Sequence, residues 1–228
     1  MTICAIHQPN FFPWAGYFDK IRQADVFIFL DEVAYPKSGS GSWCNRVKLL
    51  NAGKPMWFGL PINREPGPQL IKDVSFSNKE YNLKKLLKSL EYNYKKAPNY
   101  KKTIEFIEPL LTYPSNNLSE YNINAIKKIS NYLGLKANFI RQSEIIYNKQ
   151  LQSTELLVEL TKKVYADTYL CGNGCEGYQQ DKLFKISNID LIYQNFKVDE
   201  YNTAEDPFCG QLSLIHYLMH YYAVGKLL

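Results

Sequence analysis

The sequence predicts one α/β domain over residues 1–228, with a Rossmann-like, doubly wound and mostly parallel sheet. A mostly helical insertion is expected at about residues 79–132. Three observations lead to this prediction. The chain has 228 residues, which fits one domain of this class. Short apolar runs alternate with amphipathic segments, as in βαβ units. The run at residues 26–30 is apolar without a break, which is typical of a strand buried on both faces of a parallel sheet.

The first elements follow from local patterns. A strand is expected at residues 3–7, and a helix after Pro13, because Trp14, Tyr17, Phe18 and Ile21 recur at spacings of three and four. A proline just before a helix is favourable, since its missing N–H would have no partner there. Further strands are expected at 26–30, 46–50, 56–62 and, as a short piece, 73–77. The loop at 35–45 is rich in serine and glycine and is a candidate lid.

The middle of the chain is predicted to be helical. Helices are expected at 79–96 and 99–111, and a third begins at the capping pair Asn117 and Glu120 and ends at Gly134. Strands at 137–141, 168–171 and 191–196, a helix capped by Ser153 or Thr154, and a last helix at 212–224 complete the pattern. The last helix is aromatic and is expected to belong to the core, with a homodimer interface as the alternative.

Composition excludes several classes of protein. With 46% hydrophobic and 21% charged residues the chain is not disordered, and without an apolar run of about 18 residues it has no membrane partner. The N-terminus lacks the basic region of a signal peptide. Five scattered cysteines indicate reduced thiols and a cytoplasmic protein. The net charge of +5 comes mainly from lysines mixed with glutamates, which indicates solvated helix faces in preference to nucleic-acid binding.

Polar residues follow three predicted strands, and the carboxyl ends of parallel strands share one edge of the sheet. His7 and Gln8 follow the first strand, Asp31 the second, and a glycine loop begins at Gly172. An imidazole at such an edge can act as general base or acid when a carboxylate orients it, so His7 oriented by Asp31 is the predicted catalytic pair. The alternative is that His7 only satisfies backbone carbonyls in its own turn.

Two further segments are candidate binding elements. Arg46 offers a planar fork for phosphate or carboxylate, and Lys37 in the preceding loop is expected to close over a charged ligand. The alternative for Arg46 is an exposed residue at a strand start. Asn45, or the backbone N–H groups around Gly172, Asn173 and Gly174, would stabilise an oxyanion or phosphate.

A metal site is not expected. Cys171 and Cys175, with His216 and His220, resemble a Cys2His2 set on paper. However, the cysteine pair lacks the usual two-residue spacing, and the histidines lie in an apolar helix. A reactive Cys175 is a second option, against the simpler role of a small buried thiol.

Five segments resemble the WbqC-like protein family. The segment at residues 6–21, which begins Ile6-His7-Gln8-Pro9-Asn10, is similar to its N-terminal signature. Later parts of the family resemble residues 25–31, Trp43-Cys44-Asn45-Arg46, Tyr169-Leu170-Cys171-Gly172 and residues 208–215, which begin Phe208-Cys209-Gly210-Gln211. The resemblance therefore extends over nearly the whole chain.

The resemblance implies a role in bacterial O-antigen and surface-polysaccharide synthesis. The implied activity is an N-acyltransferase that attaches a glycyl or related group to the amine of a nucleotide-linked deoxyamino sugar. No intrinsic cofactor is implied, and the activated acyl donor stays open between a thioester, an aminoacyl phosphate and an aminoacyl-tRNA. Alternatives are a nucleotidylyltransferase or adenylate-forming ligase of Rossmann type, and a non-catalytic sugar-nucleotide-binding protein. The expected catalytic residues are His7, Asp31 and Asn45; the expected substrate-binding residues are Gln8, Asn10, Lys37, Arg46, Gly172, Asn173 and Gly174.

Overall fold

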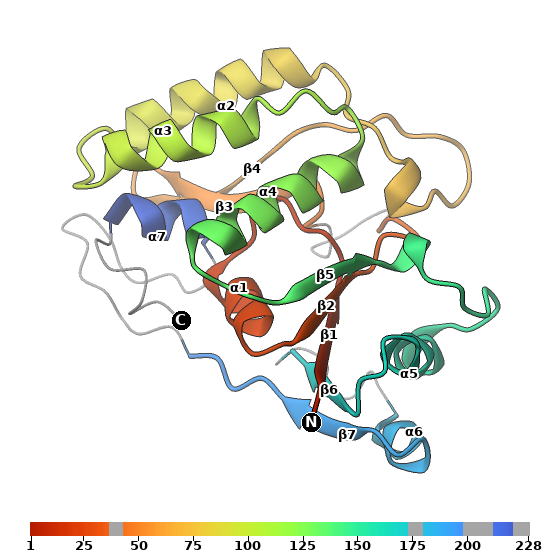
Figure 1. Cartoon of the computed structure of the whole chain (residues 1–228). Helices are drawn as coiled ribbons and strands as arrows, with labels where there is room; N and C mark the ends of the chain where they lie inside the picture. The colour runs from red at the N-terminus through yellow and green to blue at the C-terminus, as the bar shows by residue number, and fades with distance from the viewer. Residues whose placement is uncertain (37–42, 173–179, 198–211, 221–228) are drawn as a thin grey trace.

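The computed structural model describes residues 1–36, 43–172, 180–197 and 212–220. Its centre is a five-stranded sheet in the order β5-β2-β1-β6-β7, and every neighbouring pair is parallel (Figure 1). The predicted Rossmann-like class is confirmed. The strands are β1 (Ile3–His7), β2 (Val26–Phe29), β5 (Asn138–Arg141), β6 (Thr168–Cys171) and β7 (Asp190–Tyr193).

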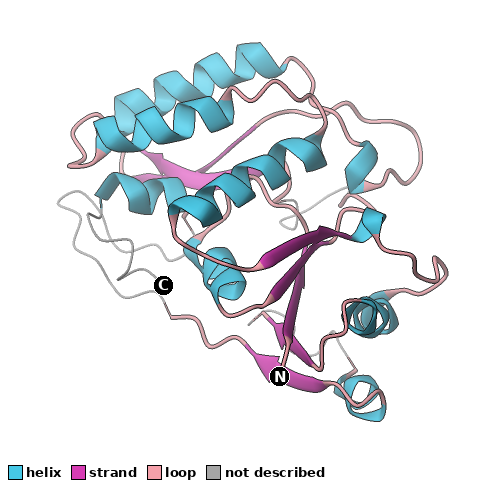
Figure 2. Ribbon diagram, in the orientation of Figure 1, coloured by secondary structure: helices cyan, strands magenta, loops and turns pink. Residues whose placement is uncertain are grey.

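Side chains of the central strands alternate between two apolar cores, one on each face of the sheet. Ala5, Phe27 and Phe29 belong to the core that includes α1 (Ala15–Arg22) and α4 (Leu118–Tyr132). Cys4 and Ile28 belong to the other core, with α5 (Ser153–Lys163) and α6 (Asp181–Ile186). Figure 2 shows helices on both sides of the sheet. Burial on both faces explains why the second strand is an unbroken apolar run.

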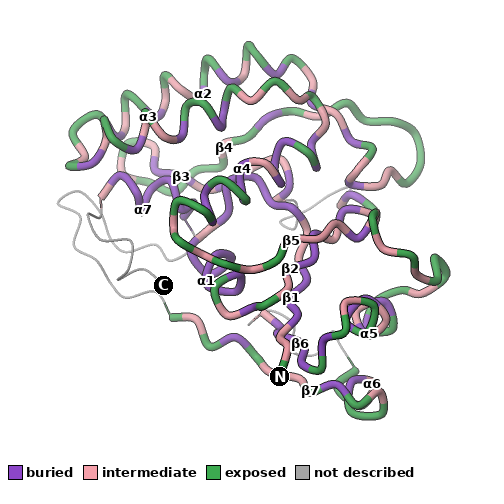
Figure 3. The backbone as a smooth tube through the Cα atoms, viewed as in Figure 1, coloured by how far each residue is buried: buried purple, intermediate pink, exposed green. Residues whose placement is uncertain are grey.

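A separate antiparallel hairpin is formed by β3 (Arg46–Asn51) and β4 (Lys54–Gly59). The turn residues Ala52 and Gly53 have φ values of 47° and 76°, as a two-residue hairpin turn requires. β4 starts earlier than predicted because Lys54 already pairs with Asn51. Most of β4 is exposed, in contrast to β1 and β2 (Figure 3). Within the hairpin, β4 therefore lies at the surface, whereas Val47, Leu49 and Leu50 of β3 belong to the core.

The predicted strand at 73–77 is wrong. The segment contains the short 3-10 helix η1 (Ile71–Asp73), followed by isolated bridges from Ser75 to Asn117 and from Phe76 to Ile62. Because the two residues bridge to two different segments, no ladder forms.

The helical middle is confirmed as α2 (Lys79–Tyr94), α3 (Tyr100–Leu111) and α4. The Asn117 side chain accepts a hydrogen bond from the Glu120 N–H at 2.9 Å, and Gly134 follows α4 with φ of 72°. The predicted side-chain cap of α5 is wrong, since its N-cap is Gln152 without a side-chain hydrogen bond. The remaining elements are η2 (Gln142–Glu144) and the buried helix α7 (Leu214–His220). In the described ranges no helix combines the length and apolarity needed to cross a membrane.

Candidate active site

A cavity of about 410 Å³ lies at the carboxyl ends of β1 and β6. The strand order runs from β1 through β2 to β5 on one side and from β6 to β7 on the other, so β1 and β6 flank the point where the topology switches. Ligands of open parallel α/β sheets bind at this point. His7 and Gln8 from the end of β1, and Tyr169 and Gly172 from β6, line the cavity. The residues that follow these two strands therefore lie at one edge of the sheet, as the sequence predicts.

Aromatic rings form much of the cavity wall. Trp14, Tyr17, Trp43 and Phe196 line it, and the Trp14 and Trp43 ring centroids are 5.2 Å apart. A Cβ at Gly16 would lie 2.8 Å from both Phe196 Cδ1 and Trp14 Nε1. Glycine at this position therefore lets both rings lie against the first turn of α1. Flat apolar walls of this kind suit the face of a sugar or a nucleobase.

His7 is held as a neutral imidazole with a defined tautomer. Its Nδ1 lies 3.1 Å from the Gln8 carbonyl oxygen, and because a carbonyl only accepts, Nδ1 carries the proton and Nε2 has the free lone pair. Burial and the neighbouring Lys20 charge lower the pKa of His7 to about 3, which the Gln8 carbonyl offsets in part. The imidazole is therefore unprotonated at neutral pH.

Lys20 is a site residue that the sequence analysis missed. It lies on α1, lines the cavity and is only 3% exposed. Its Nζ donates a hydrogen bond to the Ile6 carbonyl at 2.9 Å and lies 5.9 Å from the Tyr169 ring centroid. A buried ammonium is costly unless polar or anionic groups compensate it, and the Ile6 carbonyl is one such group here. One feature of the sequence could have revealed Lys20. It follows Tyr17 by three residues, which places it on the apolar side of the predicted helix.

Gln194 also lines the cavity and fixes α1 against the chain after β7. Its Nε2 donates to the Gly16 carbonyl at 2.8 Å and to Asp19 Oδ2 at 2.7 Å. Asp19 Oδ1 accepts two hydrogen bonds from Arg22. This network holds the first turns of α1, and with them Tyr17 and Lys20, in place.

Asp31 does not orient His7, which corrects the predicted pair. The Asp31 carboxylate accepts hydrogen bonds from the Ser143 N–H at 3.0 Å and the Ser143 hydroxyl at 2.8 Å. Among the described residues nothing links it to His7 by a hydrogen bond, and it is not part of the cavity wall. The reason is that η2, which directly follows β5, covers this end of β2. Burial raises the pKa of Asp31, although the Ser143 hydrogen bonds oppose this. The orienting group for His7 is the Gln8 carbonyl.

Glu32, the next residue, is the centre of an ionic network. Its carboxylate accepts from Lys72 at 2.6 Å, from the Tyr147 hydroxyl at 2.9 Å and from Lys149. Gln142 joins the network through the Glu32 N–H and the Tyr147 hydroxyl. Burial alone would raise the pKa of Glu32, but these hydrogen bonds outweigh it and lower the pKa to about 2. The carboxylate is satisfied by protein groups, which indicates a structural role.

The other predicted residues fall in three places. Gln8, Asn10 and Gly172 line the cavity, whereas Lys37, Asn173 and Gly174 lie outside the described residues. Asn45 accepts from the Tyr35 hydroxyl at 2.8 Å and donates to the Leu60 carbonyl at 3.0 Å, so its amide stabilises the hairpin and is not in the cavity wall. Arg46 lies outside the cavity, with its guanidinium carbon 4.5 Å from the Trp57 ring centroid.

Asn122 of α4 is a second residue that the sequence analysis missed. It is fully buried, and its Nδ2 donates to the Pro9 carbonyl at 2.8 Å and to the Cys44 carbonyl at 2.6 Å. These carbonyls belong to the two loops that carry Asn10 and Trp43 to the cavity. The Cys44 thiol lies 3.7 Å from both Gln8 Oε1 and Asn10 Oδ1. The two loops are therefore joined beneath the site.

Two of the three described cysteines, Cys4 and Cys44, are not activated nucleophiles. Burial raises the pKa of Cys4 and of Cys44 to about 12, so both remain thiols. Cys175 lies outside the described residues. Within the described ranges, no cluster of three or more His, Cys, Asp or Glu residues could hold a metal ion. His216 shares a hydrogen bond of 3.0 Å with the Tyr94 hydroxyl, and burial and the nearby His220 lower its pKa to about 3.

The fold and cavity define a parallel α/β protein with a cavity at its topological switch point. The chain belongs to the WbqC-like protein family, which it matches over residues 8–224. It is 27% identical over 212 residues to the uncharacterized protein Rv1507c of Mycobacterium tuberculosis, a match that covers 92% of this chain and 88% of that protein. No solved structure matches the chain.

Proposed function

We propose that this protein is an N-acyltransferase that attaches a glycyl or related acyl group to the amine of a nucleotide-linked deoxyamino sugar. The O-antigen setting that the family resemblance implies is part of this proposal. The observation that carries it is the pairing, in one cavity at the switch point, of a neutral imidazole with a buried ammonium. The aromatic walls fit the apolar face of a sugar ring.

The reaction requires a proton acceptor and a stabiliser of negative charge. The sugar amine attacks the acyl carbonyl carbon, and its nitrogen becomes strongly acidic as the C–N bond forms. His7 Nε2, whose lone pair is free because Nδ1–H donates to Gln8, accepts this proton. The proton then passes to the leaving group as the bond from the acyl carbon to the donor breaks.

Lys20 takes the role that was predicted for Asn45 or for the backbone N–H groups around Gly172, Asn173 and Gly174. As the carbonyl oxygen becomes negative, an ammonium held in a cavity of low polarity stabilises it strongly. One of the three Lys20 N–H groups is fixed on the Ile6 carbonyl, which orients the side chain. The Lys20 charge also keeps His7 unprotonated before the reaction.

The test is a product assay with several donors. Purified protein is mixed with a nucleotide-linked amino sugar and with glycine as a thioester, an aminoacyl phosphate or glycyl-tRNA, and the new amide is measured by mass spectrometry. We expect a product with one donor class, formed about 10²- to 10³-fold more slowly by the Lys20→Met variant. The proposal fails if no donor gives an amide with any acceptor. Pyrophosphate release from ATP and glycine without a sugar would indicate an adenylate-forming ligase instead.

A further inference from the structure

Three tryptophan rings extend from the cavity to the molecular surface, and we call them the tryptophan strip: Trp14, Trp43 and Trp57. Trp14 and Trp43 line the cavity, with ring centroids 5.2 Å apart. The Trp43 and Trp57 centroids are 4.7 Å apart, in an edge-to-face arrangement. Trp57 on β4 is 36% exposed. The strip therefore gives the cavity an aromatic extension that reaches solvent.

Two cations flank the outer ring. The Arg46 guanidinium carbon lies 4.5 Å and the Lys48 Nζ 5.3 Å from the Trp57 centroid. Lys48 is directly opposite Trp57 in the hairpin register, and Arg46 is two residues from Lys48, so the three side chains share one face. The opposite face of β3 carries buried residues such as Val47. The hairpin thus presents a flat ring and two positive charges together.

The position of Arg46 depends on a close approach of the two strands. Gly59 is the register partner of Arg46, and a Cβ at Gly59 would lie 2.3 Å from the Asn45 carbonyl oxygen and 2.5 Å from Arg46 Cβ. Only glycine leaves space for this contact. Gly59 therefore allows the close strand pairing that holds the Arg46 guanidinium beside the Trp57 indole.

We propose that the tryptophan strip and its two cations bind the nucleotide of the sugar-nucleotide substrate. The base stacks on Trp57, Arg46 and Lys48 hold the diphosphate, and the sugar passes Trp43 into the cavity. Aromatic side chains bind the face of any base, and guanidinium and ammonium groups bind phosphate oxygens. A neutral sugar or an apolar partner would use the Trp57 ring but not the charges of Arg46 and Lys48, whereas a nucleotide uses both. The inference rests on the proposed function, which it deepens by assigning the nucleotide subsite.

The test separates the base contact from the phosphate contact. Binding of UDP, dTDP, GDP and the phosphate-free nucleoside uridine is measured by titration calorimetry. Trp57→Ala is expected to weaken uridine and UDP alike, by about 5- to 150-fold, as the loss of one base stack would. Lys48→Met is expected to weaken UDP but not uridine, and to reduce the dependence of UDP binding on salt. Trp57→Phe keeps an aromatic ring and should retain most of the binding. With this result, the loss in Trp57→Ala is explained by the missing stack and not by a failure to fold.

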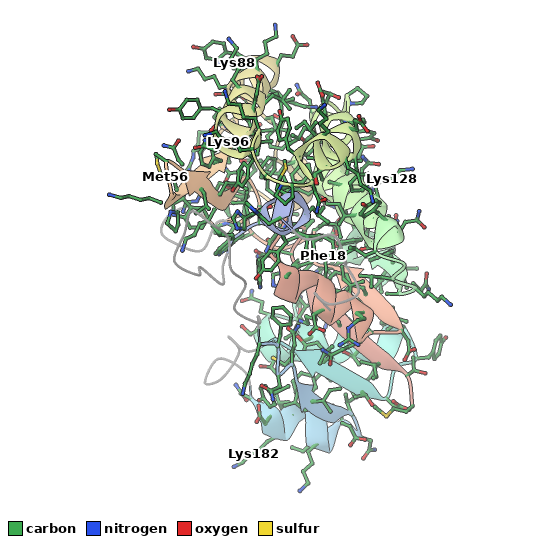
Figure 4. The ribbon with its side chains drawn as sticks, turned by 90° about the vertical axis from the view of Figure 1, so that its left-hand side faces the viewer. Phe18, Met56, Lys88, Lys96, Lys128 and Lys182 are labelled. Atoms are coloured by element: carbon green, nitrogen blue, oxygen red, sulfur yellow. The ribbon has the colours of Figure 1, made fainter. Side chains whose placement is uncertain are left out.

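Two matched charge variants serve as controls. Lys54→Met removes a charge from the first residue of β4. Lys128→Met removes one from α4, on the side of the molecule opposite Met56 of β4 (Figure 4). Both should bind UDP as the wild type does. The inference is overturned if no nucleoside diphosphate binds, if Trp57→Ala binds UDP unchanged, or if the control variants weaken UDP as much as Lys48→Met.

The product assay distinguishes failure of this inference from failure of the proposed function. If amide forms and Trp57→Ala leaves the KM for the acceptor unchanged, the nucleotide subsite is wrong and the acyltransferase stands. If UDP binding depends on Trp57 but no donor gives an amide, the subsite stands and the acyltransferase is wrong.

Discussion

The carboxyl ends of β1 and β2 are neighbours in one sheet, yet they have opposite characters. At the end of β1, His7 and nearby Lys20 line a cavity. At the end of β2, Asp31 is bound by Ser143, and Glu32 is bound by Lys72, Tyr147 and Lys149. Both ends carry polar residues that look equally functional in the sequence. The difference teaches that a site requires polar groups facing a space, whereas groups that satisfy one another hold loops together.

The largest effect is expected when the β1 end is changed. His7→Asn keeps an amide N–H at the position of Nδ1 for the Gln8 carbonyl but removes the proton acceptor Nε2. We expect kcat to fall by about 10²- to 10⁴-fold, the usual range for a general base. Steady-state kinetics with the purified variant checks this, and circular dichroism confirms its fold. An unchanged kcat would remove His7 from the chemistry.

Lys20→Met should have the next largest effect. The substitution keeps a long apolar side chain in the buried position but removes the charge, so we expect kcat to fall by about 10²- to 10³-fold. The same variant removes the positive charge that helps to lower the pKa of His7, so that pKa should rise from about 3 toward its ordinary value. NMR titration of the His7 ring measures this second result independently of activity. A His7 pKa that stays in place would show that Lys20 does not act on the imidazole.

Glu32→Gln tests the β2 end, where a loss of stability without a loss of chemistry is expected. The free energy of unfolding should fall by about 1.5–3 kcal/mol, because hydrogen bonds to a charged group are lost. The rate per folded molecule should not change. Urea denaturation and kinetics on the same sample check both statements, and a large fall in kcat at full folding would contradict the comparison.

The acid stability of the wild type sharpens the same prediction. Since the pKa of Glu32 is lowered from 4.5 to about 2, its contribution is complete above pH 4.5 and is lost as the pH falls toward 2. His7 and His216 have pKa values lowered from 6.5 to about 3, so they reduce stability in a higher window, as the pH falls from 6.5. Glu32→Gln should remove only the loss of stability that occurs below about pH 4.5. Urea midpoints measured between pH 7 and pH 3 would show whether it does.

Asp31→Asn should have the smallest effect. The neutral amide keeps an oxygen for Ser143 and avoids a buried charge whose pKa is raised, so stability should change by only about 0.5–1.5 kcal/mol. The rate should remain close to that of the wild type, because the carboxylate does not contact His7. A fall in kcat as large as that of His7→Asn would restore the predicted catalytic pair.

Local patterns were enough to predict the framework. The spacing of Trp14, Tyr17, Phe18 and Ile21 predicts α1, and the run at residues 26–30 predicts a buried parallel strand. The position of His7 at a strand end also follows from the sequence, since side chains there meet at one sheet edge.

The contacts between distant segments were not predictable in this way. Asp31 is bound by a residue 112 positions further along the chain, and no local pattern announces that η2 will cover β2. Helical spacing places Lys20 on a buried face but does not say that a cavity lies beside it. The sequence suggests which groups reach an edge, while the packing of later segments decides which of them are already occupied.

Asn122 has a consequence for how far this protein can be reduced in size. One amide from α4 donates to carbonyls 113 and 78 positions earlier in the chain. A shortened version that omits the helices between Lys79 and Tyr132 would leave the Pro9 and Cys44 carbonyls without these donors, and both loops of the cavity would lose their common anchor. Any minimal form has to keep α4 or replace that one side chain with another double donor.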